Sequence, residues 1–183
     1  MIPAGYMYKA VARAPQGAGA AADVYAVSGC ISGCFADYIP YWRHNGYWLF
    51  DSLETIQALA AESAIDLSGL TLFYYEVFEL QYEEASGRWL PFAPEPSLPT
   101  QVRAPRAMQL EGYDVVTFSA QTSPECSPLS CNSLAERVAV NRHCLFDAFE
   151  DARQSIEAGV FQGSEPGPFR IFAVHTVSGV KPG

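Results

Sequence analysis

The residues best suited to chemistry in this chain are a cysteine, a histidine and an aspartate in its second half. Cys131 lies two residues before Ser133, which forms with Glu136 the Ser-x-x-Glu capping pattern that opens a short helix. A helix N-terminus lowers the pKa of a nearby thiol and favours the reactive thiolate. With His143 as base and Asp114 as the acid that orients it, Cys131 would complete a nucleophilic triad.

The alternative for Cys131 is a structural thiol, buried in a loop rich in serine and proline. Sequence spacing does not bring Cys131, His143 and Asp114 together, and no local signature of a cysteine hydrolase is present. We therefore expect Cys131 to be structural rather than a catalytic nucleophile.

Cysteine pairs offer a second kind of chemistry, the binding of zinc. Cys30 and Cys34 are four residues apart, and Cys126 and Cys131 are five apart, in flanks rich in turn-forming residues. Structural zinc sites use pairs separated by about two to four residues, so both spacings are permitted. The chain has enough apolar residues to form a core without a metal. We expect neither a bound metal nor another cofactor.

Aromatic side chains are concentrated in residues 38–50, around the dipeptide Asn45-Gly46. This dipeptide is typical of a type I′ turn, in which both central residues have positive φ, and it predicts a tight hairpin. Alternation along the strands directs some of the rings toward the sheet. The rings on the other face either pack under the proline-rich loop or form a contact surface for a partner. The candidate binding residues are Trp42, His44, Tyr47 and Trp48.

Glu76 is a further candidate, because it interrupts an otherwise apolar strand pattern in residues 70–84. A carboxylate there either pairs with an arginine or has a raised pKa and lines a cavity. We favour pairing.

The composition restricts the class of protein. The chain has 183 residues, of which 49% are hydrophobic and 17% charged, enough to form a full core. A net charge of −9 disfavours nucleic acid and anionic membranes as partners, and leaves another protein or a small molecule. No apolar run approaches the ~20 residues of a membrane span, and no secretory signal is visible. Five cysteines suggest no disulfide framework, so we expect reduced thiols and a cytoplasmic location.

Hydrophobic periodicity and turn residues predict the elements. Strands are expected at residues 5–13 and 21–28, paired as a hairpin, and at 70–84, near Trp89, at 113–119 and at 169–177. Helices are expected after Asp51-Ser52, after Ser133 and near 144–158. Residues 91–106 contain five prolines and form a surface loop or a break between subdomains.

This element order indicates an α+β fold, with a mostly antiparallel sheet and two or three helices packed on it. We expect residues 1–183 to form a single domain. No internal repeat is apparent in the sequence.

Part of the second half resembles uncharacterised bacterial proteins of unassigned function. The shared motifs are GYDV at residues 112–115, an S-x-L-S-containing loop with Cys131 at residues 127–132, and E-x-x-P-F at residues 165–169. The resemblance lies within residues 112–177, about a third of the chain, and implies no activity.

Taken together, the sequence favours a non-enzymatic binding protein with an acidic surface and an aromatic contact region. The alternative is a cysteine-dependent hydrolase or transferase that uses Cys131 and His143.

Overall fold

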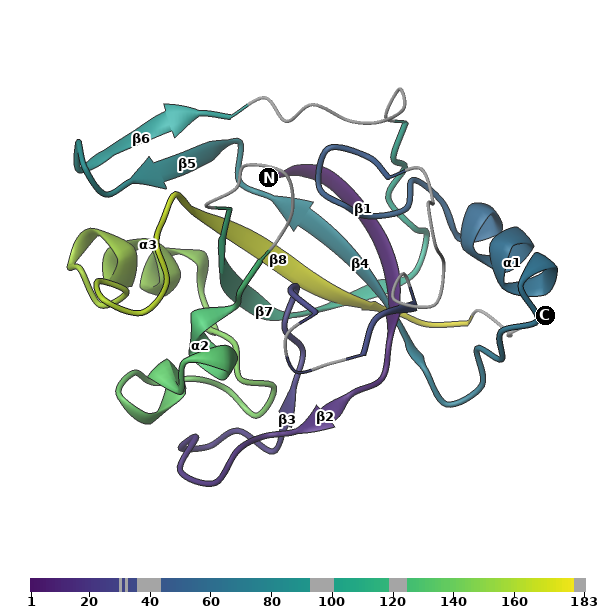
Figure 1. The fold of residues 1–183 in the computed structure, drawn as a ribbon, viewed down its shortest axis with the longest axis horizontal. Helices are drawn as coiled ribbons and strands as arrows, with labels where there is room; N and C mark the ends of the chain where they lie inside the picture. The colour runs from purple at the N-terminus through teal and green to yellow at the C-terminus, as the bar shows by residue number, and fades with distance from the viewer. Residues whose placement is uncertain (30, 32, 36–43, 93–100, 119–124, 180–183) are drawn as a thin grey trace.

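The computed structural model describes residues 1–29, 31, 33–35, 44–92, 101–118 and 125–179. A mostly antiparallel sheet of six strands forms its centre, with helices packed around it (Figure 1). This arrangement confirms the α+β class. The sheet takes strands from both sides of the proline-rich segment 91–106.

The main sheet has the order β1-β4-β8-β5-β6, with β7 also paired to β8, and two short strands pair separately. The strands are β1 (Ile2–Lys9), β2 (Ala12–Arg13), β3 (Asp23–Val24), β4 (Thr71–Val77), β5 (Leu80–Glu83), β6 (Arg88–Pro91), β7 (Met108–Thr117) and β8 (Phe169–Val177). The antiparallel pair β4 and β8 is central, and both strands are buried along most of their length. Because protein covers both of their faces, their sequences are apolar at consecutive positions.

Helix α1 (Leu53–Glu62) begins where the sequence predicts. The hydroxyl of Ser52 accepts the N–H of Thr55, and Glu54 lies in the first turn. Helix α3 (Phe149–Glu157) begins later than predicted, because the chain before it is extended and bridges to β7. No helix in the described part of the chain is long and apolar enough to span a membrane.

The helix predicted after Ser133 is only a 3₁₀ turn, η2 (Leu134–Glu136). Ser133 has a left-handed backbone with φ of 56°, and its side chain makes no capping hydrogen bond. A separate short helix, α2 (Pro128–Cys131), precedes it. Cys131 is therefore the last residue of a helix, at the negative end of the dipole. The catalytic alternative for Cys131 placed its thiol before a helix N-terminus, and the structure does not place it there.

The two hairpins predicted in the first fifty residues also differ from the structure. Strand β1 pairs with β4, and only the two-residue strands β2 and β3 form the predicted first hairpin. Neither Asn45 nor Gly46 has the positive φ of a type I′ turn; that conformation occurs at Trp48, with φ of 56°. Residues 36–43, which include Trp42, lie outside the described residues.

The side chain of Asn45 determines the conformation of this turn. Its Oδ1 accepts the N–H groups of Tyr47 at 2.9 Å and Leu49 at 3.2 Å, while its Nδ2 donates to the carbonyl of Ala4 at 2.7 Å. The N–H of Trp48 closes the turn by donating to the carbonyl of Asn45. A buried amide thus replaces the backbone pattern of a type I′ turn.

The same turn recurs in the second half of the chain. Asn141 Oδ1 accepts the N–H groups of His143 at 2.9 Å and Leu145 at 3.2 Å, and its Nδ2 donates to the carbonyl of Glu111 at 2.7 Å. The N–H of Cys144 donates to the carbonyl of Asn141, and Cys144 has φ of 60°. These four hydrogen bonds of the first turn therefore each have a counterpart in the second.

The strands that receive these turns are equivalent as well. Gly5 in β1 and Gly112 in β7 have φ of +142° and +147°, and each follows a β-bulge. A β-carbon on Gly112 would lie 2.6 Å from the carbonyl oxygen of Phe146, so only glycine fits there. The bridges between turn and strand also match: Tyr6 pairs with Phe50, and Tyr113 with Phe146.

These features divide the fold into two similar halves, which the strand register relates by an approximate two-fold axis. Each half runs from an edge strand through the asparagine turn and a helix to a central strand, as β1, α1 and β4 or as β7, α3 and β8. Tyr75, the partner of Gly5, pairs across the centre with Val174, the partner of Gly112. The helices α1 and α3 consequently lie at opposite ends of the molecule, α1 at the right and α3 at the left of Figure 1.

The expectation that the chain has no internal repeat is therefore wrong. Residues 45–51 and 141–147 share Asn, Leu, Phe and Asp at corresponding positions, and a Gly-Tyr pair precedes each segment. The loops between these residues differ in length, which hides the repeat from a search for a fixed period.

Candidate functional site

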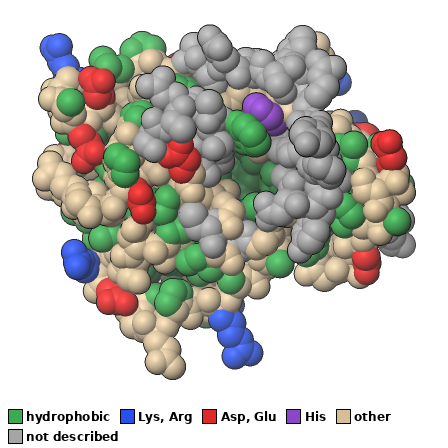
Figure 2. All heavy atoms as spheres, viewed as in Figure 1, with side chains coloured by type: hydrophobic (Ala, Val, Ile, Leu, Met, Phe, Trp, Pro, Cys, Tyr) green, Lys and Arg blue, Asp and Glu red, His purple; other side chains and the backbone are tan. Residues whose placement is uncertain are grey.

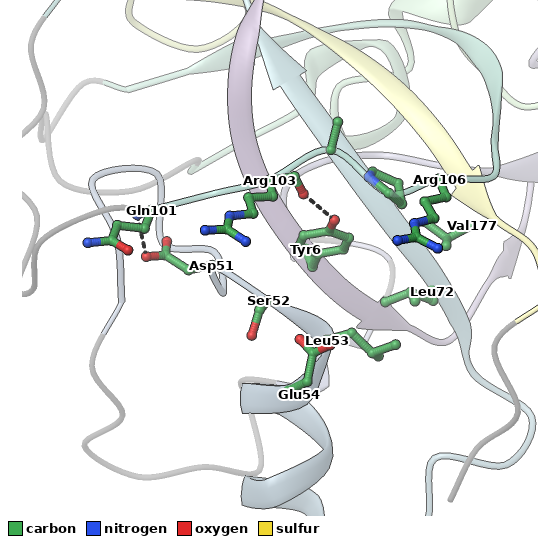
Figure 3. Close-up of a pocket in the computed structure, with 12 residues that line it drawn as sticks. Tyr6, Asp51, Ser52, Leu53, Glu54, Leu72, Gln101, Arg103, Arg106 and Val177 are labelled. Atoms are coloured by element: carbon green, nitrogen blue, oxygen red, sulfur yellow. Dashed lines mark hydrogen bonds between the residues drawn. The ribbon is translucent and has the colours of Figure 1, made fainter.

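An open pocket of about 530 Å³ lies between the first turn of α1 and the segment 101–106 that leads into β7 (Figure 3). Its volume falls in the range of small-molecule sites. Tyr6 of β1, Leu72 of β4 and Val177 of β8 contribute the side chains of the sheet. The pocket therefore combines an apolar surface from the sheet with a helix N-terminus and an irregular segment.

Hydrogen bonds hold the walls of the pocket together. Asp51, just before α1, accepts the N–H of Gln101 at 2.8 Å and the side-chain amide of Asn45 at 3.1 Å. The hydroxyl of Tyr6 donates to the carbonyl of Arg103 at 2.5 Å. Burial, and secondly the negative charge of Glu54, raise the pKa of Tyr6, so its hydroxyl remains a donor. The pocket is preformed by contacts within the chain.

Two arginines give the pocket its positive charge. Arg103 and Arg106 reach from the segment 101–106 toward the first turn of α1 (Figure 3). Within the described part of the chain, neither guanidinium forms an ion pair or a hydrogen bond. Unbonded N–H groups and the dipole of the helix N-terminus add positive potential. Of the two carboxylates that line the pocket, Asp51 already accepts two hydrogen bonds, which leaves Glu54 as the available one.

The corresponding region of the second half is filled by aromatic rings. Three positions are equivalent in the two halves: Tyr6 and Tyr113, Leu53 and Phe149, and Val177 and Phe78. The Phe149 ring lies 5.0 Å from that of Phe78 and 6.0 Å from that of Tyr113, both edge-on, and Trp89 adds a further ring at 5.5 Å from Phe78. The pocket is open in the first half because smaller aliphatic residues take the places of these phenylalanines.

His143 is placed away from the triad that the sequence suggested. Its Nδ1 is 2.6 Å from a carboxylate oxygen of Asp23, and its Nε2 is 3.5 Å from one of Glu111. Its ring stacks on Tyr25 with 4.0 Å between the centroids. Both nitrogens therefore face carboxylates, and neither faces Cys131, the candidate nucleophile of the alternative hypothesis.

Asp114 and Cys131 likewise have other partners. Asp114 accepts the hydroxyl of Ser127 at 2.6 Å and the N–H of Val27 at 2.8 Å, in place of the histidine that a nucleophilic triad would put beside it. The sulfur of Cys131 is 3.8 Å from the hydroxyl oxygen of Ser28. Among the described residues the contacts of a nucleophilic triad are not formed. The structural role of Cys131 stays a prediction.

Asp114 belongs to a buried polar cluster behind the central sheet. Burial has the largest effect on the pKa of Asp114 and raises it to about 7. The hydrogen bonds from Ser127 and Val27 and the charge of Lys9 act in the opposite direction and lower the pKa. Lys9 is itself buried and donates to the three carbonyl oxygens of residues 26–28. The backbone of residues 26–28 is thus held by hydrogen bonds from Lys9 on its carbonyl groups and to Asp114 from the N–H of Val27.

We expect Asp114 to make the stability of the protein depend on pH. The pKa of Asp114 in the folded protein lies above the unfolded value of about 3.9. The stability that its protonated carboxyl group contributes is therefore complete below pH ~4, and it is lost as pH rises through 7. Asp114→Asn removes this titration while keeping an acceptor. Between pH 4 and 8 the wild type should lose about 2–4 kcal/mol relative to the variant in urea unfolding. A difference that stays constant with pH would contradict the raised pKa.

The aromatic candidates are only partly exposed. Tyr47 is buried, and its ring lies 5.1 Å from the guanidinium of Arg170. His44 and Trp48 stack with 3.9 Å between their ring centroids, and Trp48 is 38% exposed. Trp42 lies outside the described residues. The described part of the proposed contact surface is therefore the His44–Trp48 pair.

The cysteines proposed as zinc ligands have separate surroundings. Cys34 is buried and bridges to Lys9, whereas the thiol of buried Cys126 donates to Asn132 at 3.1 Å. Cys30 is outside the described residues. Across the described ranges, no group of three or more His, Cys, Asp and Glu side chains is placed to hold a metal ion.

Among the described residues the carboxylate of Glu76 lies beside a histidine, and not beside the arginine that we favoured as its partner. Its Oε2 lies 3.4 Å from Nε2 of His175 on β8, a diagonal neighbour, since the direct partner of Glu76 in the ladder is Ala173. Burial lowers the pKa of His175, and the charge of Glu76 opposes this shift.

Sequence reasoning missed the pocket residues. Arg103 and Arg106 lie in the proline-rich segment, which the sequence indicated only as a loop. The one local signal was the repeated Asn-x-x-x-Leu-Phe-Asp pattern, which marks Asp51 and the start of α1.

Charged side chains of both signs are scattered over the face in Figure 2, and its described residues form no continuous basic surface. No family model, curated protein or solved structure matches the chain. The geometry of the pocket therefore carries the functional conclusion.

Proposed function

We propose that this chain is a non-enzymatic binding protein, and that its pocket holds a small organic molecule with a carboxylate group. The observation that carries the proposal is the pair Arg103 and Arg106, which line a preformed pocket without a carboxylate partner among the described residues. Guanidinium groups bind carboxylates through charge-assisted hydrogen bonds, and the N-terminus of α1 adds to the attraction. This site replaces the aromatic contact region as the leading candidate.

The size and wall chemistry of the pocket favour a small ligand over a large one. The apolar side chains of Leu53, Leu72 and Val177 lie beside the charged groups, so a ligand with one apolar and one anionic end satisfies both. An acidic protein binds such an anion only where local positive charge overcomes its net charge, and the two arginines supply it. We also propose a cytoplasmic location, on the cysteine content of the sequence.

A titration with hexanoate and hexylamine tests the proposal. Hexanoate should shift the backbone amide NMR resonances of residues 52–54, 101–104 and 106, and hexylamine should not. Arg103→Gln and Arg106→Gln should each weaken hexanoate binding by about 10-fold or more, since hydrogen bonds to charged groups contribute about 1.5–3 kcal/mol. Glu54→Gln should strengthen it, because it removes the available carboxylate.

Arg88→Gln is the matched control, since Arg88 is an exposed arginine on β6 and does not line the pocket. It should leave the affinity unchanged. If the control and the pocket variants lose the same hexanoate affinity, the loss comes from the change in net charge and not from the pocket. Binding that tolerates both pocket substitutions would contradict the proposal.

A further inference from the structure

Because the two halves are similar, the pocket in the first half can be compared with the equivalent region of the second half, which aromatic side chains fill. In the second half the side chains of Phe78 and Phe149 pack edge-on, with 73° between their ring planes. Their equivalents in the first half are Val177 and Leu53, which line the open pocket. The same backbone arrangement therefore surrounds aromatic rings in one half and open space in the other.

The other residues that surround the pocket in the first half resemble those that surround the aromatic rings in the second half. Tyr6 and Tyr113 are conserved between the halves, and Tyr113 meets the Phe149 ring edge-on at 72°. Leu72 of the pocket corresponds to Ile171, so the apolar side chain of the central strand is also kept. The first half thus retains the tyrosine and the aliphatic side chain that surround the rings, and lacks the rings themselves.

The charged groups stand at the edge of this apolar region. In Figure 3, Leu53, Leu72 and Val177 lie together on one side of the pocket, and the guanidinium of Arg106 lies beside them. Arg103 lies across Tyr6 from Arg106 (Figure 3). A flat ring among the aliphatic side chains places a short acidic substituent within reach of the arginines.

We infer that the ligand of this pocket is an aromatic carboxylate. Its ring takes the position that the Phe78 and Phe149 rings occupy in the second half, and its carboxylate faces Arg103 and Arg106. The inference rests on the proposed function, to which it adds the class of the apolar group. Aromatic rings favour edge-on contacts such as Tyr6 offers, beyond the gain from burying apolar area.

Three probes test the ring and the charge separately. Phenylpropionate should bind about 10-fold more tightly than hexanoate, and phenylpropylamine should leave the amide resonances of residues 52–54, 101–104 and 106 unshifted. Equal affinities for phenylpropionate and hexanoate would overturn the aromatic inference while the carboxylate-binding function stands. If neither acid shifts these resonances, the proposed function fails as well.

A double variant tests the position of the ring. Leu53→Phe with Val177→Phe introduces the ring pair of the second half and should lower phenylpropionate affinity by about 10-fold or more. Leu53→Met with Val177→Ile keeps aliphatic side chains of similar size and should bind as the wild type does. Thermal unfolding of both variants verifies that they fold. Unchanged affinity in a folded Phe/Phe variant would overturn the proposed position of the ring, and the three probes decide the inference should that variant not fold.

Discussion

Gly112→Ala is expected to lower the free energy of unfolding by about 3–5 kcal/mol. Gly112 has φ of +147°, a conformation that residues with a β-carbon avoid. A β-carbon there would also lie 2.6 Å from the carbonyl oxygen of Phe146 and 2.8 Å from the β-carbon of Leu145. Strain and overlap add, because β7 and the asparagine turn cannot separate without breaking the bridge between Tyr113 and Phe146. Urea unfolding measures the loss.

Gly163→Ala measures the cost of backbone strain at positive φ without the steric overlap that a β-carbon meets at Gly112. Gly163 has φ of +77° and nothing within 4 Å of the added β-carbon, so its substitution should cost only about 1 kcal/mol. Gly5→Ala should resemble Gly112→Ala, since its β-carbon would lie 2.6 Å from that of Leu49. Similar losses at Gly163 and Gly112 would show that the close approach of the turn to the strand contributes nothing.

Asn45→Ala should destabilise the protein by a similar amount, about 3–5 kcal/mol. The substitution leaves the N–H groups of Tyr47 and Leu49 and the carbonyl of Ala4 without the partner that the buried amide supplies. Each unsatisfied buried group costs about 1–3 kcal/mol. The same change removes a hydrogen bond to Asp51, which lines the pocket, so ligand affinity should fall as well.

Two further substitutions assign the effect to particular atoms. Asn45→Asp keeps an acceptor for both N–H groups but directs a carboxylate at the carbonyl of Ala4 and at Asp51, and it should be at least as damaging. Asn132→Ala is the comparison, since Asn132 is half-buried and its amide, among the described residues, bonds only to side chains, accepting the weak thiol donor of Cys126 and donating to Glu165 at 3.3 Å; it should cost about 1 kcal/mol or less. A mild Asn45→Asp variant would show that the donor is dispensable, contrary to the role that we give it.

The elements that sequence reasoning placed correctly are those with local causes. Ser52 caps α1 through a hydroxyl three residues from its partner, and Gly159, with φ of +74°, follows the end of α3. Strand β8 has its predicted bounds, because a run buried on both faces is apolar throughout. Gly87, with φ of +63°, turns the chain between β5 and β6 as expected. In each case residues within a few positions supply the physical reason.

The incorrect predictions have causes that lie far away in the chain. The Asn45-Gly46 turn is decided by a hydrogen bond to Ala4, 41 residues earlier, and this bond overrides the local preference for a type I′ turn. His143 pairs with Asp23, 120 residues away, and so is not positioned as a base for Cys131. Propensity acts over a few residues and does not describe such contacts.

The sequence by itself determined the fold class and most elements, since these follow from periodicity, caps and glycines. Only the tertiary structure decided where a ligand could bind. Tyr6 and Arg103, joined by a hydrogen bond across 97 residues, meet because β1 and the segment before β7 pass the same end of α1. The positions of Leu53 and Phe149 look alike in sequence, and only packing shows that one lines a pocket while the other fills its counterpart. Cavities depend on which distant side chains meet, and local pattern does not encode that.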